Sequence, residues 1–95
     1  MKKECHTEQL VKAIIAINNE EECKEFLNDI CTFQEIEKLV QRLEAAQLLL
    51  DGKTYEQVIQ ETNISSTTLS RISRCIRYGN NGYKNILDKI NKREN

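Results

Sequence analysis

The stretch TYEQVIQETNISSTTLSRISRCIRYG, residues 54–79, is typical of two short helices joined by a tight turn. Thr54 is followed three residues later by a glutamine, which is the spacing of a capping box, and it predicts the start of the first helix. Asn63 suits the left-handed backbone that such a turn needs, and Gly79 is placed to end the second helix. We therefore predict a helix-turn-helix spanning residues 54–78.

Apolar residues occur at the positions where a helix-turn-helix needs internal contacts. Val58 and Ile59 are expected to supply the contact from the first helix, and Ile64 to close the corner after the turn. Leu69 and Ile72 form the expected inner face of the second helix. Many such motifs have alanine where this chain has isoleucine at 59, so a slightly wider helix crossing is expected.

The outward face of the second predicted helix has small hydroxyl side chains near its start and arginines along its length. Small side chains let a helix enter the major groove, whereas arginine grips guanine or neutralises phosphates. The predicted base-reading residues are Ser66, Thr67, Thr68, Ser70 and Arg71. The predicted phosphate contacts are Lys53, Thr54, Arg74, Arg77 and Lys84.

The charge is unevenly divided along the chain, although the net charge is only −1. Residues 1–52 contain six Lys/Arg and eleven Asp/Glu, whereas residues 53–93 contain eight Lys/Arg and three Asp/Glu. The sequence has no acid between Thr62 and Lys84. This asymmetry favours contact between one face and a polyanion, with an unevenly charged solvated surface as the plainer alternative.

Outside this motif the apolar residues also recur at intervals of three and four, and the chain has no proline. A first helix is expected from about Thr7 to an Asn-Asn pair, and a second with Asn19 as its cap. Thr32 opens a long third helix that Gly52 ends, and a last helix is expected over residues 83–92. The predicted fold class is all-α with about six helices.

A chain of 95 residues suits one domain, so residues 1–95 are expected to form a single domain. A core of this size gives limited stability, and oligomerisation is a common remedy. Residues 7–52 are the expected dimerisation helices.

The cysteines predict neither a disulfide framework nor a metal site. Cys5, Cys23, Cys31 and Cys75 form no C-x-x-C pair, and the adjacent Cys5 and His6 lack a second ligand pair. We expect no cofactor and no metal. The sequence has no apolar run of membrane-span length and no signal peptide, so a cytoplasmic protein without membrane contact is expected.

Several short matches over residues 29–83 are shared with a known family. They are Cys31-Thr32, Glu35-Ile36, Gln41-Arg42-Leu43-Glu44, Gly52-Lys53-Thr54-Tyr55, Leu69-Ser70-Arg71, Arg74-Cys75, Tyr78-Gly79-Asn80 and Gly82-Tyr83. This combination resembles the YerC/YecD-type family of the Trp repressor superfamily. The resemblance covers more than half of the chain and is far more specific than a bare helix-turn-helix.

The resemblance implies an intertwined all-α homodimer that binds double-stranded DNA and regulates transcription in a bacterium. Two recognition helices in successive major grooves require a near-palindromic operator. The expected function is that of a sequence-specific DNA-binding transcriptional regulator, namely a repressor.

The resemblance also raises the question of a corepressor. Arg42 and Arg71 are similar to the two arginines that flank the tryptophan pocket of the Trp repressor. Ile72, however, stands where that protein has glycine, and Cys75 where it has a serine that helps bind the amino group. A branched side chain at 72 is expected to fill the pocket, so our hypothesis is that no tryptophan is needed. A salt bridge or a solvated position is the preferred alternative for Arg42.

Two other classes of function were weighed against DNA binding. A protein–protein interaction module could dock through the acidic stretch at residues 20–25, although acids in a first helical turn are explained by the helix dipole. An enzyme is not expected, because the sole histidine is His6 and the sequence has no nucleophile–base set and no glycine-rich phosphate loop.

Overall fold

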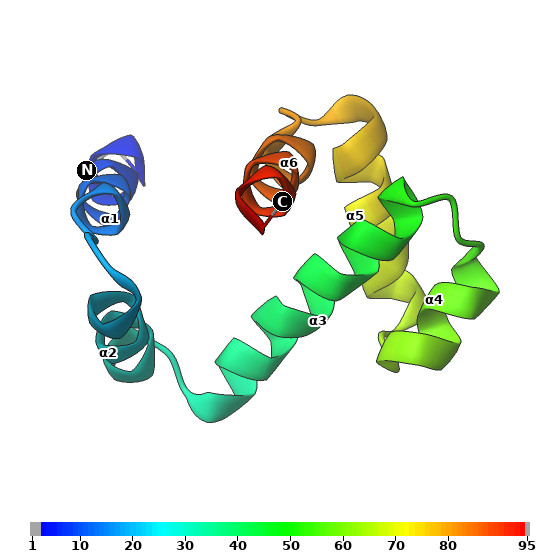
Figure 1. Ribbon diagram of the computed structural model, residues 1–95, viewed down its shortest axis with the longest axis horizontal. Helices are drawn as coiled ribbons and strands as arrows, with labels where there is room; N and C mark the ends of the chain where they lie inside the picture. Colours follow the sequence, from blue (N-terminus) through cyan, green and yellow to red (C-terminus); the bar gives the residue numbers. More distant parts are fainter. Residues whose placement is uncertain (1–2, 95) are drawn as a thin grey trace. The chain divides into compact units, whose positions relative to one another are not determined.

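The computed structural model describes the backbone of residues 3–94 and the side chains of residues 6–92 (Figure 1). Six helices follow one another: α1 (Lys3–Ile15), α2 (Glu20–Ile30), α3 (Phe33–Leu50), α4 (Tyr55–Thr62), α5 (Ser66–Tyr78) and α6 (Gly82–Glu94). The described residues contain no strand. The predicted all-α class with six helices is confirmed.

Two predicted helix boundaries differ from the structure. α1 begins at Lys3 rather than at about Thr7, because the polar residues before Thr7 are all compatible with a helix and none is proline. α6 extends from Gly82 to Glu94, beyond the predicted 83–92. The helix can extend in both directions because none of the added residues is proline, which would interrupt its hydrogen bonds.

The predicted caps of the middle helices are confirmed. The side chain of Asn19 accepts a hydrogen bond from the backbone N–H of Glu22 at 2.8 Å, which caps α2. Thr32 and Glu35 form a reciprocal capping box at the start of α3. Gly52 has the expected positive φ of 93°, which ends α3 without steric strain.

The contacts divide the chain into two compact units, Met1–Ile36 and Glu37–Asn95. The first unit contains α1, α2 and the first turn of α3, and none of its described side chains is fully buried. Ile17, Phe26 and Leu27 are partly buried, whereas the apolar side of α1 is exposed. The first unit of a single chain therefore has no closed hydrophobic core in its described part.

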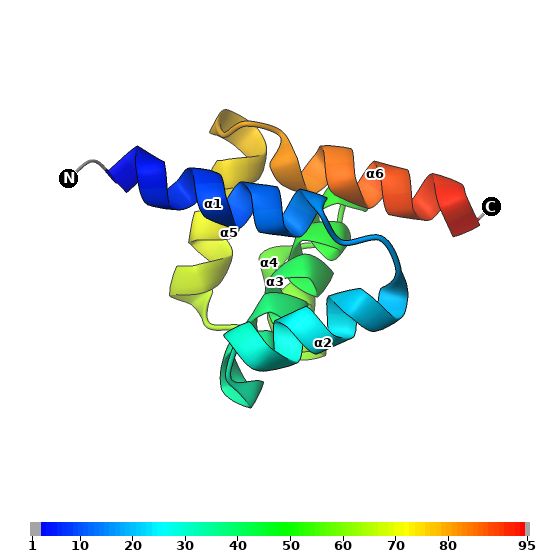
Figure 2. The ribbon, with the colours of Figure 1, turned by 90° about the vertical axis from the view of Figure 1, so that its left-hand side faces the viewer.

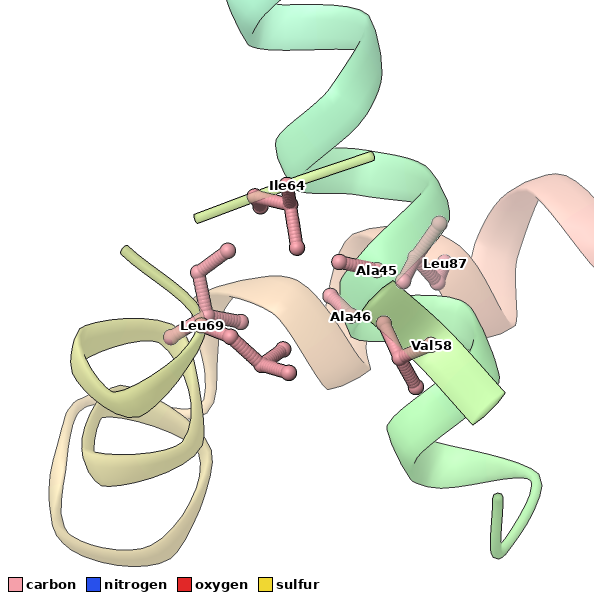
Figure 3. Packing of buried hydrophobic residues seen from close by; sticks show 7 residues of the cluster. Ala45, Ala46, Val58, Ile64, Leu69 and Leu87 are labelled. Atoms are coloured by element: carbon pink, nitrogen blue, oxygen red, sulfur yellow. The ribbon is translucent and has the colours of Figure 1, made fainter. Parts of the chain in front are cut away.

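The core of the second unit joins α3 to the three helices that follow it. Ala45 and Ala46 on α3 are fully buried and lie close to Val58 on α4 and Leu87 on α6 (Figure 3). Leu69 on α5 belongs to the same cluster and is also fully buried. Full burial of a leucine contributes about 1.5–3 kcal/mol, and the small alanine side chains leave room for the neighbouring helices. This core fixes α4 and α5 against α3.

The chain turns sharply after α5, and α6 then leaves in a different direction (Figure 2). Gly79 ends α5 in an extended conformation, and a Cβ at this position would collide with the carbonyl oxygen of Cys75. Asn81 has a φ of 63°, so the turn contains one left-handed asparagine. Asn91 Nδ2 on α6 donates to Gln47 Oε1 on α3 at 3.1 Å, which ties the last helix to the core.

No helix in the described part of the chain combines the length and the apolar character that crossing a membrane requires.

Candidate nucleic-acid interface

The turn between α4 and α5 has the left-handed asparagine that the sequence predicted. Asn63 has φ 60° and ψ 19°, and its N–H donates to the carbonyl of Ile59 at 2.8 Å. The hydroxyl of Thr62, which is buried, donates to the carbonyl of Val58 at 2.8 Å and accepts from the N–H of Ile64 at 3.3 Å. The hydroxyl therefore joins the end of α4 to the first residue beyond Asn63.

The start of α4 is held by the predicted capping box. Thr54 Oγ1 accepts from the N–H of Gln57 at 3.2 Å, and Gln57 Oε1 accepts from the N–H of Thr54 at 2.9 Å. Ser65 caps α5, because its side chain accepts from the N–H of Thr68. These caps set the bounds of both helices of the motif independently of any ligand.

α5 has a buried side and a polar outer side. Leu69 and Ile72 face the core, as predicted, with Ile76 partly buried beside them. The opposite side of the helix carries residues at intervals of four, three and four positions, which align along one line. We call Thr67, Arg71, Arg74 and Tyr78 the outer row; all four are exposed.

The predicted base-reading residues do not share one environment. Ser66, Thr67, Ser70 and Arg71 are exposed on α5. Thr68 is partly buried, and its Oγ1 accepts a hydrogen bond from Ser65 Oγ at 2.9 Å. Thr68 thus takes part in the helix cap, whereas the other four side chains are free to meet a ligand surface.

The predicted phosphate contacts come from three places in the second unit. Lys53 and Thr54 lie at the start of α4, Arg74 and Arg77 on α5, and Lys84 on α6. All five are exposed. Lys84 forms an ion pair with Asp88 at 3.3 Å, so it offers less uncompensated charge than the other basic residues.

Arg42 and Arg71, the two arginines compared with a tryptophan site, lie in different surroundings. Arg42 borders a pocket of about 340 Å³ between α3 and the start of α5, together with Gln41, Ser65 and other residues. Arg71 does not line that pocket, and Ile72 is buried in the core with 2% of its surface exposed. The side chain of Ile72 thus occupies core space rather than the wall of this pocket.

The structure points to three polar residues that sequence reasoning left out of the site. Tyr78 is 80% exposed in the outer row, and its spacing of eleven positions from Thr67 is the signal that could have identified it. Tyr55 and Ser73 border a second pocket beside Lys53 and Arg77. No spacing rule connects Tyr55 with Ser73, because they lie on different helices.

The described residues contain no group of three or more His, Cys, Asp or Glu side chains that could hold a metal ion. Cys23 and Cys31 are partly buried and Cys75 is exposed, and each has a free thiol. The side chain of Cys5 lies outside the described residues.

Known proteins of similar sequence share almost the whole chain. Residues 5–91 match the model of the Trp repressor protein family. The uncharacterized protein YerC of Bacillus subtilis (strain 168) is 42% identical over 87 residues, an overlap of 92% of this chain and 84% of YerC.

Solved structures show the same fold. A Trp repressor candidate from Staphylococcus aureus superposes with a TM-score of 0.84 at 40% identity, covering 92% of this chain and 87% of the other. A TrpR-like protein from Eubacterium eligens ATCC 27750 gives a TM-score of 0.85 at 36% identity, with coverages of 94% and 92%. Proteins of this kind form a regulatory, non-enzymatic class. By sequence and by fold, the chain belongs to the Trp repressor family.

Proposed function

We propose that this protein is a sequence-specific DNA-binding repressor of transcription that inserts α5 into the major groove. The outer face of α5 is the observation that carries the proposal. It is exposed, it has no acid, and its small hydroxyl side chains precede Arg71, Arg74 and Arg77. Among the described residues, none of these arginines forms an ion pair. A convex helix with this composition matches the width and the negative charge of the major groove.

The packing of α5 supports the proposal that this helix recognises DNA bases. Its inner face is held by α3 and α4, so the outer row keeps a defined direction without a ligand. Base readout depends on such a fixed direction, because each hydrogen bond requires a donor at a set position.

We further propose that the protein acts as a homodimer in which the whole chain behaves as one domain. Rows of large apolar side chains are exposed on separate helices: Leu10, Val11 and Ile14 on α1, Leu39, Val40 and Leu43 on α3, and Ile86 and Ile90 on α6. Monomeric proteins rarely leave such rows in water. A second copy that covers them would also pair two recognition helices, which favours a near-palindromic operator.

The regulator is proposed to work without tryptophan, in the cytoplasm of a bacterium. The residues at 72 and 75 support this, because Ile72 and Cys75 stand where the Trp repressor has the glycine and the serine of its tryptophan pocket. Isothermal titration with tryptophan should give no saturable heat. Saturable binding would contradict the tryptophan-independent part of the proposal only.

The decisive experiment is selection of bound duplexes from a random library, followed by gel shift with the selected site and with a scrambled duplex. We expect a near-palindromic consensus and at least about 10³-fold preference over the scrambled duplex. The variant Arg71→Ala should lose this preference, whereas Lys24→Ala on α2 should retain it as a charge-matched control. Equal affinity of the wild type for all duplexes would overturn sequence-specific binding. Absence of all DNA binding would favour an interaction module instead.

A further inference from the structure

A second pocket lies between the turn after α3, the start of α4 and the C-terminal half of α5. Its volume is about 270 Å³. We call it the basic pocket; Leu49 and Ile76 give it apolar walls, and Lys53, Tyr55, Ser73 and Arg77 give it polar ones. This lining combines positive charge, hydroxyl groups and apolar surface in one small concave site.

Ser73 is the unusual member of this lining. Its residue surface is only 8% exposed, and its hydroxyl makes no hydrogen bond with any described residue. The other buried hydroxyl, that of Thr62, both donates and accepts within the protein. No fully buried side-chain N or O atom among the described residues lacks a partner, so the unbonded hydroxyl of Ser73 is reachable from the pocket that it lines and is available to a ligand there.

The charge of the basic pocket is also uncompensated. Lys53 directly precedes Thr54, which caps α4, and Arg77 lies in the last turn of α5. Neither side chain forms an ion pair with a described residue. No Asp or Glu lines the pocket. The capping box satisfies the N–H of Gln57, which leaves the first N–H groups of α4 to add partial positive charge. The site therefore favours an anion.

We propose that the basic pocket binds a phosphate group, with Lys53 and Arg77 neutralising its charge and Ser73 donating a hydrogen bond to one of its oxygens. A phosphate has the acceptor oxygens and the charge that match this set of groups. It could belong to the DNA backbone, in which case the inference rests on the proposed function. It could also belong to a small phosphorylated molecule whose apolar part contacts Leu49 and Ile76.

Titration of the ¹⁵N-labelled full chain with inorganic phosphate and with phenyl phosphate tests the pocket directly, at an ionic strength held constant with sodium chloride. We expect saturable shifts of the amide signals of Lys53, Tyr55 and Ser73. Ser73→Ala should weaken phosphate binding about tenfold, because a hydrogen bond to a charged group is lost. Arg77→Gln should weaken it at least as much.

Thermal unfolding separates this role from a structural one. The hydroxyl of Ser73 bonds to no described residue, so Ser73→Ala should leave the unfolding midpoint about the same while phosphate affinity falls. Cys75→Ala is the control on the same helix, because Cys75 is exposed and does not line the pocket. It should leave phosphate binding unchanged.

Duplexes with single neutral methylphosphonate linkages identify the source of the phosphate. If it belongs to DNA, one such linkage should weaken wild-type binding about tenfold and abolish the difference between wild type and Ser73→Ala. If it belongs to a small molecule, phenyl phosphate should bind more tightly than inorganic phosphate, and Ser73→Ala should bind DNA like wild type.

Two results would overturn the proposal. One is the absence of saturable shifts with both phosphate compounds together with unchanged DNA affinity of Ser73→Ala. The other is a set of shifts that Ser73→Ala and Arg77→Gln both leave unchanged. Failure of the wild type to bind any duplex would refute the proposed function. The phosphate titration would still show whether the basic pocket binds phosphate.

Discussion

Gln41 on α3 donates a hydrogen bond from Nε2 to the backbone carbonyl of Thr62 at 2.9 Å, across 21 positions of sequence. Thr62 is the last residue of α4, and the next residue is the left-handed Asn63. The bond therefore ties the turn of the helix-turn-helix to the long helix. The N–H and hydroxyl bonds inside the turn are local, whereas this bond fixes the turn in relation to the core.

Replacing Gln41 with alanine should lower the free energy of unfolding by about 1 kcal/mol, because the carbonyl of Thr62 loses its partner. Urea unfolding followed by circular dichroism measures the change. Gln60→Ala is the matched control: Gln60 is exposed on α4, so its replacement should change stability by less than about 0.5 kcal/mol. Equal effects of the two substitutions would show that the bond to Thr62 is energetically unimportant.

Two substitutions of Asn63 should show whether the turn depends on the left-handed backbone or on contacts of the asparagine side chain. Its φ of 60° is strained for residues with a Cβ other than asparagine or aspartate, so Asn63→Ala should cost about 1–2 kcal/mol. Asn63→Gly should cost much less, because glycine adopts this conformation readily. Thermal and urea unfolding of both variants give the comparison. A glycine variant as unstable as the alanine variant would mean that the asparagine side chain itself stabilises the turn.

Arg71→Ala should lose about 1–3 kcal/mol of binding free energy at the selected operator and relax the preference at one or two base positions. The physical reason is its central place in the outer row, where a bidentate contact with a base is possible. Fluorescence anisotropy with operators substituted one base pair at a time measures this. If each base substitution lowers the affinity of wild type and of Arg71→Ala by the same factor, Arg71 contacts phosphate rather than a base.

Arg74→Ala and Lys84→Ala should both weaken all duplexes alike, but to different extents. Arg74 forms no ion pair with a described residue, so its loss should reduce the slope of log affinity against log salt concentration by about 1. Lys84 is paired with Asp88, and part of its charge is already compensated. Its removal should therefore change the slope less. A larger change for Lys84 would contradict this order.

A charge placed on an apolar row should separate the proposed dimer. Val40 is 50% exposed on α3 and Ile14 is 53% exposed on α1. Val40→Glu and Ile14→Glu should each yield monomer in sedimentation equilibrium at concentrations where the wild type is a dimer, because burying an unpaired carboxylate is costly. Gln34→Glu adds the same charge at an exposed polar position of α3 and should remain dimeric. A monomeric wild type would refute the dimer outright.

The local features of this fold were predictable because they depend on neighbours in sequence. The capping boxes at Thr32 and Thr54 join residues three positions apart, and the left-handed turn needs only an asparagine at 63. The inner face of α5 follows from helical periodicity alone. The start of α1 was mispredicted because a polar segment without proline contains no signal that stops a helix.

The sequence by itself determined the all-α class, the caps, the turn residue and the sign of charge on α5, since each depends on contacts within one or two helical turns. Only the tertiary structure decided that Gln41 bonds to the carbonyl of Thr62, and that Ser73 lines one pocket with Lys53 and Arg77. The physical reason is that burial and pocket formation depend on how separate helices pack. A pattern read along one helix shows which side chains share a face, but not which neighbour covers them.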